Sequence, residues 1–503
     1  MLPLLDQAPA RAQAERAAVE AAPQLAEFVT DDVALPRFHV WTLGCQMNHS
    51  DSEEMAGALA AAGCAEAADL ETADLIVINS CAIREAAEQK VIGRMGHLAN
   101  LRAANPALRV VLTGCSVRVD NTAVLHKRYP QVDLFLRPDE EPELTARLGL
   151  AGATAPGLLA ARAAAVGEGR VERASAISAW LPIIYGCDKT CTYCIVPFSR
   201  GPEVSRPFDD VLDEARALAA AGYREVTLLG QNVNSYGHDL VPESRFADVR
   251  TGRHLGRRLD LDGKPDMAAL LRAIDSLRTA DGVPAISRVR FVTSHPWDLS
   301  ERLIAAMAEC PSVCEHLHLP VQSGDDAVLR RMGRQYTVDA YLELVERLRS
   351  AVPGITLTTD VIVGFCGETE AQFESTLELL RTVRFETVFA AAFSPRPGTP
   401  AARLSDDVPR AEKKRRLQAL LQLQEGIGRE ANEAWAGRTT EVLVDQQRPR
   451  SSHDVDGHGP RLAGRNRNNK LVHLDGPVDL IGQLVNVRVA HTGPYSLSGT
   501  LDD

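Results

Sequence analysis

Three segments in the N-terminal third of the chain repeat one plan: an apolar run, a tight glycine or Asn-Ser turn, and then a cysteine. The segments are residues 38–45, 73–81 and 109–115. Their cysteines lie 36 and then 34 positions apart, which is the length of one strand and one helix in a parallel sheet. The plan predicts that Cys45, Cys81 and Cys115 lie at the carboxyl ends of neighbouring parallel strands, the edge where open α/β sheets place their sites.

A second alternation of strands and helices begins near Trp180 and continues to about residue 393. The predicted strands are residues 181–185, 225–229, 288–292, 316–319, 355–363 and 387–393. Helical stretches separate them, including residues 267–277, 338–350 and 371–383. Six strand–helix units predict a partial or open barrel whose functional groups gather at the carboxyl ends of the strands.

One cysteine motif follows the first of these strands directly. Cys187, Cys191 and Cys194 have the spacing C-x3-C-x2-C. Three cysteines are one too few for a structural zinc ion, which takes four tetrahedral ligands, but they suit a [4Fe–4S] cluster with one iron open to a small molecule. A zinc site completed by another Cys or His, or three unrelated thiols, is the alternative.

The motif resembles the signature of the radical S-adenosylmethionine superfamily, with Tyr193 as the aromatic residue before the last cysteine. The resemblance implies that the amino and carboxylate groups of S-adenosylmethionine bind the open iron. It also implies that one electron from the cluster cleaves the sulfonium and yields a 5′-deoxyadenosyl radical.

The N-terminal set of Cys45, Cys81 and Cys115 has a plain alternative, because free cysteines are commonly buried in cores. Three cysteines at equivalent points of successive units are hard to assign to packing alone, and three thiolates again leave one iron open. The two sets together indicate two [4Fe–4S] clusters, one that generates a radical and one from which something, most simply sulfur, is delivered.

From residue 37 to the end, the chain resembles the methylthiotransferase family. The stretches that carry the resemblance are residues 42–53, 79–85, 113–115, 194–207, 228–237, 288–296 and 318–324. Within the family, Gln231-Asn232, Ser294-His295-Pro296 and Gln322-Ser323-Gly324 resemble the tRNA-modifying branch. That branch is implied to place a methylthio group on carbon 2 of N6-isopentenyladenosine at position 37, in the tRNA anticodon loop. One S-adenosylmethionine donates the methyl group and a second supplies the radical.

Two other functions stay open on the sequence. The related branch of the family modifies an aspartate of a ribosomal protein. A non-catalytic RNA-binding protein whose cysteines hold zinc belongs to a different class. The reaction implied by the resemblance also needs an electron donor such as flavodoxin or ferredoxin.

The C-terminal region changes pattern after residue 436. Short alternating runs at residues 440–444, 471–474 and 484–489 predict a small all-β barrel. Residues 464–470 resemble a TRAM domain, an RNA-binding module. Residues 446–474 hold six Lys or Arg against two Asp, and residues 413–416 are Lys-Lys-Arg-Arg. Both segments are candidates for tracking an RNA backbone, with a solvated helix face as the alternative for the second.

Several single residues are further candidates. Six polar residues near strand ends are expected to contact the nucleoside or S-adenosylmethionine, or else to hydrogen-bond the barrel loops: Gln231, Asn232, Ser294, His295, Gln322 and Asp360. Arg200 and Arg206 face a carboxylate or phosphate, or form ordinary ion pairs. His316 and His318 share one strand face and are expected to line the barrel or its core. Cys64, Cys310 and Cys314 are expected to be structural. Cys366 departs from the proline usual in the family and is either a tolerated small residue or an oxidisable thiol.

Composition limits the setting. Ten cysteines in 503 residues are too few for a disulfide scaffold and suit a reducing cytosol. No apolar run is long enough to span a membrane, and the N-terminus lacks a secretory signal. The net charge of −12 argues against a general nucleic-acid coat but permits a local basic patch.

The predicted architecture is α/β and consists of an N-terminal parallel-sheet domain, a central partial (β/α)6 barrel and a small C-terminal β-barrel. The predicted parts are an extension (1–36), the N-terminal domain (37–150), a linker (151–176), the central domain (177–436) and the C-terminal domain (437–503). We expect a cytoplasmic monomer.

Overall fold

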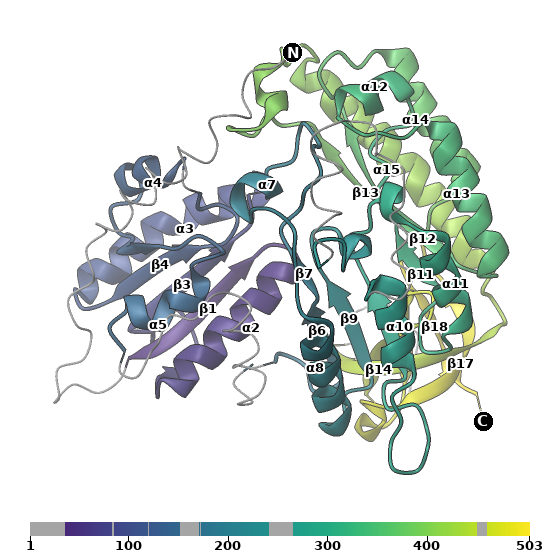
Figure 1. Ribbon diagram of the computed structural model, residues 1–503, viewed down its shortest axis with the longest axis horizontal. Coiled ribbons are helices and arrows are strands. Elements are labelled where there is room, and N and C mark those ends of the chain that lie inside the picture. The colour runs from purple at the N-terminus through teal and green to yellow at the C-terminus, as the bar shows by residue number, and fades with distance from the viewer. Residues whose placement is uncertain are drawn as a thin grey trace. The chain divides into compact units, whose positions relative to one another are not determined.

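The computed structural model describes residues 36–82, 85–118, 120–150, 171, 173–240, 265–449 and 460–502. The predicted N-terminal extension, most of the predicted linker, residues 241–264 and part of the basic segment 446–474 lie outside the described residues. The described residues up to 174, together with 198–201, form one compact unit, and the described residues from 175 onward, without 198–201, form a second. Figure 1 shows the elements of both units.

The first unit is built on a five-stranded parallel sheet with the order β2-β1-β3-β4-β5. Its strands are β1 (Arg37–Leu43), β2 (Ala65–Glu66), β3 (Leu75–Ser80), β4 (Arg109–Thr113) and β5 (Leu134–Phe135). Its helices are α2 (Gln46–Ala61), α3 (Glu85–Ala104), α4 (Thr122–Arg128) and α5 (Leu144–Arg147), with the short η1 (Glu141–Glu143). Every residue of β3 is buried, as expected for a central parallel strand covered on both faces.

Alternate residues of these strands serve two separate cores. Ile76 and Ile78 pack with α3 residues such as Leu98, whereas Leu75 and Val77 pack with α2 residues such as Leu59. Because successive side chains of a strand point to opposite faces, α2 and α3 cover opposite faces of the sheet. This arrangement leaves the carboxyl edge of the strands for the cysteine loops.

The second unit begins with six parallel strands in sequence order around an open barrel. The first three form the sheet β10-β9-β6 and the last three form the sheet β11-β12-β13, and a parallel bridge between Val289 and Val313 joins the two. The strands are β6 (Ser178–Pro182), β9 (Glu225–Leu229), β10 (Arg288–Phe291), β11 (His316–His318), β12 (Thr356–Val363) and β13 (Thr387–Ala392). A short antiparallel pair, β7 (Ile184–Tyr185) and β8 (Val204–Ser205), follows β6.

Helices lie outside these strands, as Figure 1 shows. They are α8 (Phe208–Ala220), α10 (Met267–Asp275), α11 (Glu301–Glu309), α12 (Asp326–Arg331), α13 (Val338–Ala351), α14 (Glu370–Val383) and α15 (Arg410–Glu433), with η2 (Val233–Ser235), η3 (Pro296–Asp298) and η4 (Pro400–Arg403). The short helix α7 (Val196–Ser199) is divided between the two units. Side chains that cap their first turns, such as Asp266, Ser300 and Thr337, fix where several of them begin. The largest core of the protein lies between these helices and the strands.

The C-terminal part of the second unit is a closed β-barrel with the order β14-β15-β16-β18-β17. Its strands are β14 (Thr439–Arg448), β15 (Arg461–Asn466), β16 (Leu471–Asp475), β17 (Leu484–Thr492) and β18 (Leu497–Leu501), with the short η5 (Val478–Leu480). The α/β fold class predicted from the sequence is therefore confirmed, including the parallel N-terminal sheet and the small C-terminal barrel. Among the described residues, none of the helices combines the length and apolar character needed to cross a membrane.

Candidate functional site

The N-terminal cysteines follow three adjacent strands at matching points. Leu43 of β1 pairs with Ser80 of β3, and Asn79 of β3 pairs with Thr113 of β4, so the three strands end at one level. Cys81 comes directly after β3 and its amide donates to the carbonyl of Leu43 at 2.8 Å. Cys45 and Cys115 each follow their strand by two residues. The sequence prediction that these cysteines share one sheet edge is therefore correct as a matter of placement.

A pair of buried asparagines ties this edge together. Asn48 Nδ2 donates to Asn79 Oδ1 at 2.8 Å, and Asn79 Nδ2 returns a bond to the Asn48 carbonyl at 2.8 Å. Asn48 Oδ1 also accepts from the Cys45 amide at 3.2 Å. Both asparagine side chains are fully buried. The pair therefore links the turn that carries Cys45 to the strand that carries Cys81, which fixes their spacing.

Charged groups of the same unit surround Cys115. Arg200 Nε lies 3.1 Å from Cys115 Sγ, and Arg200 Nη2 donates to Asp51 Oδ2 at 2.5 Å. Burial raises the pKa of the Cys115 thiol, and the Arg200 guanidinium opposes that rise. Burial also raises the pKa of Glu141, which accepts a bond from Thr113 Oγ1 at 2.7 Å. Arg200, a candidate for S-adenosylmethionine or phosphate, instead supplies positive charge to the N-terminal cysteine edge.

The central cysteine loop lies at the carboxyl end of β6 and β7. Burial raises the pKa of the Cys187 thiol well above its usual value, and the charges of Glu203, Cys194 and Cys191 add to this rise. The three thiols therefore lie within electrostatic reach of one another, and the thiolate of Cys187 is costly unless positive charge is supplied. Iron supplies such charge and deprotonates a thiol that it binds, so the donor set fits an iron–sulfur cluster.

Contacts with later parts of the second unit hold this loop in place. Thr192 donates its amide to the Met332 carbonyl at 2.9 Å and its hydroxyl to the Arg331 carbonyl at 2.9 Å. Gly333 approaches so closely that a Cβ there would lie 2.7 Å from the Thr190 carbonyl oxygen. Its φ of +71° is also one that favours glycine. The turn after α12 is thus shaped to support the cysteine loop.

Gln231 and Asn232, both predicted to bind a cofactor, lie beside the loop. Gln231 Oε1 accepts from the Gly186 amide at 2.6 Å, immediately before Cys187. Asn232 Nδ2 donates to Asp298 Oδ2 at 2.7 Å, and Asp298 also pairs with Lys189. Burial raises the pKa of Asp298, but Lys189, His295 and His238 together more than offset that effect and lower the pKa to about 2. At least part of each amide is therefore used to position the loop.

Several buried polar atoms at this rim have no hydrogen-bond partner among the described residues. They are Asn232 Oδ1, Asn234 Oδ1, Ser294 Oγ, and Nε and Nη1 of Arg334. A buried polar group left without a partner costs about 1–3 kcal/mol, so such a group is expected to face a ligand or water. Thr293 and Gln322 adopt φ values of +70° and +75° nearby, and strained backbone of this kind gathers at functional sites.

Arg334 also lies at this rim and was not predicted from the sequence as a site residue. Its side chain is buried, and its guanidinium lies 6.0 Å from the ring centre of Tyr193 and 5.8 Å from that of Tyr336. It lines a cavity of about 650 Å³ that Thr190 of the cysteine loop also borders. The sequence offers little signal for it, because it lies in the turn between α12 and α13 and does not directly follow a strand.

Three basic candidates for ligand or RNA contacts prove to be structural. Arg206 is buried and donates to Glu214 Oε2 at 2.7 Å and to the Pro182 carbonyl at 2.8 Å. Lys413 and Arg416 are also buried. The prediction of an RNA surface or a solvated face at residues 413–416 was therefore wrong for these two side chains, because they point into the protein.

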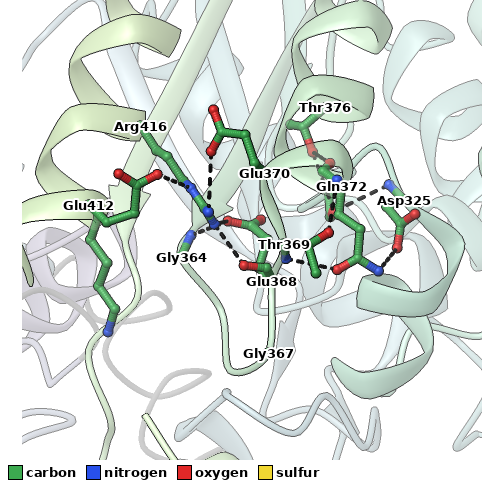
Figure 2. A network of polar contacts seen from close by, with 12 residues as sticks. Asp325, Gly364, Gly367, Glu368, Thr369, Glu370, Gln372, Thr376, Glu412 and Arg416 are labelled. Atoms are coloured by element: carbon green, nitrogen blue, oxygen red, sulfur yellow. Dashed lines mark hydrogen bonds and ion pairs between the residues drawn. The ribbon is translucent and has the colours of Figure 1, made fainter. Parts of the chain in front are cut away.

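Figure 2 shows what Arg416 does. Its guanidinium donates to Glu368 Oε2 at 2.8 Å and to Glu412 Oε1 at 2.8 Å. The same Glu368 oxygen accepts from the Gly364 amide at 2.6 Å. This network holds the loop 364–368, whose Phe365 and Cys366 pack in a small core against Tyr193. Cys366 is 4% exposed, and burial raises its pKa, so it is a packing residue rather than a reactive thiol.

The segment 464–470, which suggested RNA binding, is bound to the amino ends of the barrel strands. Arg467 pairs with Glu315 at 2.7 Å, just before β11. Asn468 donates to the Gly354 carbonyl at 2.9 Å, and its own carbonyl accepts from Thr356 at the start of β12 at 3.0 Å. From the barrel side, Arg290 donates to the Asn466 carbonyl at 2.7 Å. These side chains are used to dock the small barrel, so they are not an open RNA surface.

The remaining cysteines, Cys64, Cys310 and Cys314, are buried as expected. Within the part of the chain that the structure describes, no three Cys, His, Asp or Glu side chains converge on a point that could hold a single metal ion. A [4Fe–4S] cluster does not require such convergence, because each thiolate binds a different iron.

Comparisons with known proteins agree on family and fold. The description "Radical SAM superfamily" matches residues 181–380, and "Uncharacterized protein family UPF0004" matches residues 37–137. A tRNA-2-methylthio-N(6)-dimethylallyladenosine synthase from Carboxydothermus hydrogenoformans is 43% identical over 92% of this chain and 99% of its own. The one from Geobacillus thermodenitrificans is 43% identical over 92% of this chain and 83% of its own.

Among solved structures, the radical S-adenosylmethionine methyltransferase TsrM from Kitasatospora setae, with cobalamin and a [4Fe–4S] cluster bound, has a TM-score of 0.51 at 15% identity. The match covers 84% of this chain and 82% of that one. At this identity the likeness concerns the fold alone.

Proposed function

The chain belongs to the family of tRNA-2-methylthio-N(6)-dimethylallyladenosine synthases, and on that premise we propose which of its residues carry the reaction. The protein is a radical S-adenosylmethionine enzyme that methylthiolates N6-isopentenyladenosine at position 37 of tRNA. It uses [4Fe–4S] clusters and S-adenosylmethionine. In our proposal Cys187, Cys191 and Cys194 hold one cluster, and Cys45, Cys81 and Cys115 hold the other.

The observation that carries the first assignment is the loop itself. Cys187 feels the charges of both Cys191 and Cys194 at the carboxyl end of the barrel strands, and buried polar atoms nearby have no hydrogen-bond partner among the described residues. When bound there, the cluster supplies an electron to S-adenosylmethionine and so gives a radical able to attack an unreactive C–H bond. The chain's own part is to fix the loop through Thr192 and Gln231 and to keep bulk water from the thiols.

Arg334 and Ser294 are proposed to meet S-adenosylmethionine. Two nitrogens of the buried Arg334 guanidinium, Nε and Nη1, have no hydrogen-bond partner in the part of the chain that the structure describes, and the carboxylate of S-adenosylmethionine would supply one. Tyr193, Gln231 and Asn232 keep their proposed cofactor role, chiefly by orienting the loop that the cofactor meets.

At the N-terminal edge, Arg200 is proposed to stabilise the thiolate of Cys115, as a nearby guanidinium lowers the cost of a buried negative sulfur. The Asn48–Asn79 pair would hold Cys45 and Cys81 at the separation that one cluster needs.

For partners, we propose tRNA binding through the anticodon loop, a reduced flavodoxin or ferredoxin as the electron donor, a monomeric state and a cytoplasmic location. The closed C-terminal barrel is proposed to be an RNA-binding TRAM domain. Its contacts with RNA would use residues other than the docked segment 464–470.

Nucleoside mass spectrometry tests the function. The protein is reconstituted anaerobically with iron and sulfide, reduced, and incubated with S-adenosylmethionine and isopentenylated tRNA. The 2-methylthio nucleoside is expected. S-adenosylmethionine cleavage with unchanged tRNA would leave the radical chemistry standing and overturn the substrate assignment.

A further inference from the structure

The inner face of the open barrel is defined by strand alternation. Val388, Ala390 and Ala392 of β13 pack with the helical core, as do Leu357, Val361 and Val363 of β12 and Leu317 of β11. Because side chains alternate along a strand, Phe389 and Ala391, Asp360 and Ile362, and His318 face the opposite side. Both Phe389 and Ala391 are exposed on this inner side, so side chains do not fill it there.

Phe389 is conspicuous on that inner side because its side chain is 55% exposed. Its strand neighbour in the register is Asp360 of β12. His318 lies edge-on to its ring, with ring centres 5.6 Å apart. His318 is in turn held by Thr358 Oγ1 at 2.9 Å and by Asp360 Oδ2 at 3.4 Å. One face of an otherwise supported aromatic ring is thus open.

The height of Phe389 in the barrel follows from the register. The next inward pair toward the carboxyl end is Ile362 with Ala391, and Ile362 packs in the small core that includes Tyr193 of the cysteine loop. Phe389 therefore lies one inward pair, or rung, about 7 Å below Ile362, which packs against the same small core as Tyr193. Toward the amino end, Thr356 is bonded to Asn468, so the docked segment closes that end of the strand.

The chemistry of these rungs matches a modified purine. An exposed aromatic ring stacks on the flat face of a base, worth about 1–3 kcal/mol. The rung above it presents only Ala391 and Ile362, an apolar surface suited to a branched hydrocarbon. The His318–Asp360 pair offers polar atoms beside the ring. An adenine that carries an isopentenyl group has both a flat face and such a hydrocarbon.

We propose that Phe389 is the platform on which the isopentenylated adenine of tRNA stacks, with Ile362 and Ala391 receiving the isopentenyl group. This inference rests on the proposed function and adds a residue that determines substrate specificity. S-adenosylmethionine also carries an adenine, and the apolar rung is the reason for choosing the tRNA base.

Three variants test the proposal in the full-length, reconstituted enzyme. Phe389→Ala removes the ring, Phe389→Trp keeps a stacking face, and Phe389→Leu keeps apolar volume without a π-face. Leu421→Ala, which trims an exposed apolar residue of α15, is the matched control. Iron content and thermal unfolding confirm that each variant is folded and loaded.

The expected result is a split between the two substrates. Phe389→Ala and Phe389→Leu raise the KM for isopentenylated tRNA at least about fivefold and leave the KM for S-adenosylmethionine unchanged. More 5′-deoxyadenosine is formed per methylthiolated product. Phe389→Trp stays near the unaltered enzyme, and so does the control. Phe389→Ala also narrows the preference for isopentenylated over unmodified tRNA.

Two results would overturn the proposal. A raised KM for S-adenosylmethionine with unchanged tRNA kinetics would assign the ring to the cofactor's adenine. Unchanged kinetics for both substrates would show that the Phe389 ring binds neither of them. Failure of the proposed function can be distinguished from failure of this proposal, because the unaltered enzyme would then give no 2-methylthio product.

Discussion

The two cysteine sets hold equal numbers of thiols but obtain their geometry in opposite ways. Cys45, Cys81 and Cys115 follow three strands, and the hydrogen bonds of a parallel sheet set their spacing. Cys187, Cys191 and Cys194 lie on one loop, whose shape depends on contacts with segments more than a hundred residues later. The pairing of the sheet strands therefore positions the first set of cysteines. The second set is close in sequence, and contacts with later segments of the chain hold its loop in shape.

The charges differ as well. A guanidinium approaches Cys115 at 3.1 Å, whereas the charged group that acts most strongly on Cys187 is a carboxylate, that of Glu203. The central thiolates therefore depend more on the positive charge of bound iron than the N-terminal ones do. Substitutions that separate the two sites should expose this difference.

The largest expected effect comes from removing one thiol of either set. Cys191→Ser should abolish both 5′-deoxyadenosine formation and tRNA methylthiolation. Cys81→Ser should abolish methylthiolation but leave S-adenosylmethionine cleavage. Each variant should retain about half of the iron of the unaltered protein, because each loses one of two [4Fe–4S] clusters. Iron analysis and product assays check this, and Cys310→Ser is the matched control. Loss of cleavage in Cys81→Ser would contradict the division of labour.

A second effect concerns the outside support of the central loop. Arg416→Met leaves Glu368 buried without its partner, which should lower the free energy of unfolding by about 3–5 kcal/mol. Thermal or denaturant unfolding measures it, and adding Glu368→Gln should recover much of the loss. Arg429→Met, at an exposed pair on the same helix, should change stability little.

The same variant has a pH signature. Burial raises the pKa of Glu368, so its protonated form is favoured in the folded state. The contribution of Glu368 to the free energy of unfolding is therefore greatest below its pKa in the unfolded chain, about 4.5. That contribution is lost as the pH rises through the higher pKa that Glu368 has in the folded protein. Without Arg416 that loss should be larger, so the deficit of Arg416→Met should shrink as the pH falls toward 4.5. A deficit independent of pH would show that Glu368 is not the group left uncompensated.

A third effect belongs to the N-terminal edge alone. Asn79→Ala breaks the bonds that connect the strand of Cys81 to the turn of Cys45 and should reduce methylthiolation about 10- to 100-fold. Cleavage of S-adenosylmethionine should persist at its normal rate. Asn105→Ala, at an exposed loop, is the control. Equal losses in both activities would mean that Asn79 supports the whole fold rather than one site.

The smallest effect tests the docked segment 464–470. If Arg467 serves docking, Arg467→Ala and Glu315→Gln should each cost about 1 kcal/mol of stability, because the pair is only partly buried. Neither should change the salt dependence of tRNA binding. If Arg467 instead contacts a phosphate, only its own variant should reduce the slope of log K against log salt, by about 0.9. Both cysteine sites should keep their iron in either variant.

Much of this architecture could be predicted because its signals are local. The strand at Glu225–Leu229 and the helix near Val338–Ala351 follow from apolar runs and periodicity. The matching positions of Cys45, Cys81 and Cys115 follow from a repeated plan. The strand β15 (Arg461–Asn466) was missed, because its polar residues resembled a basic loop.

The partners of basic side chains could not be predicted from sequence. Arg200 lies a few residues after Cys194 in the chain, yet it pairs with Asp51. Lys413 and Arg416 lie in a segment with a typical solvent-facing composition, but both are buried against carboxylates, Lys413 against the nearby Asp406 and Arg416 against the distant Glu368. The sequence shows whether the net charge of a segment is positive or negative, whereas only the tertiary fold decides which of its charged side chains form ion pairs.

The docked segment has a consequence for modularity. The small barrel is joined to the strand ends largely through main-chain oxygen atoms: Arg288 donates to the Arg465 carbonyl, Arg290 to that of Asn466, and Asn468 to that of Gly354. A main-chain acceptor survives almost any substitution at its own position, so half of this junction is insensitive to sequence drift. A C-terminal barrel taken from a distant relative should therefore assemble on this chain, provided that the donor side chains are kept.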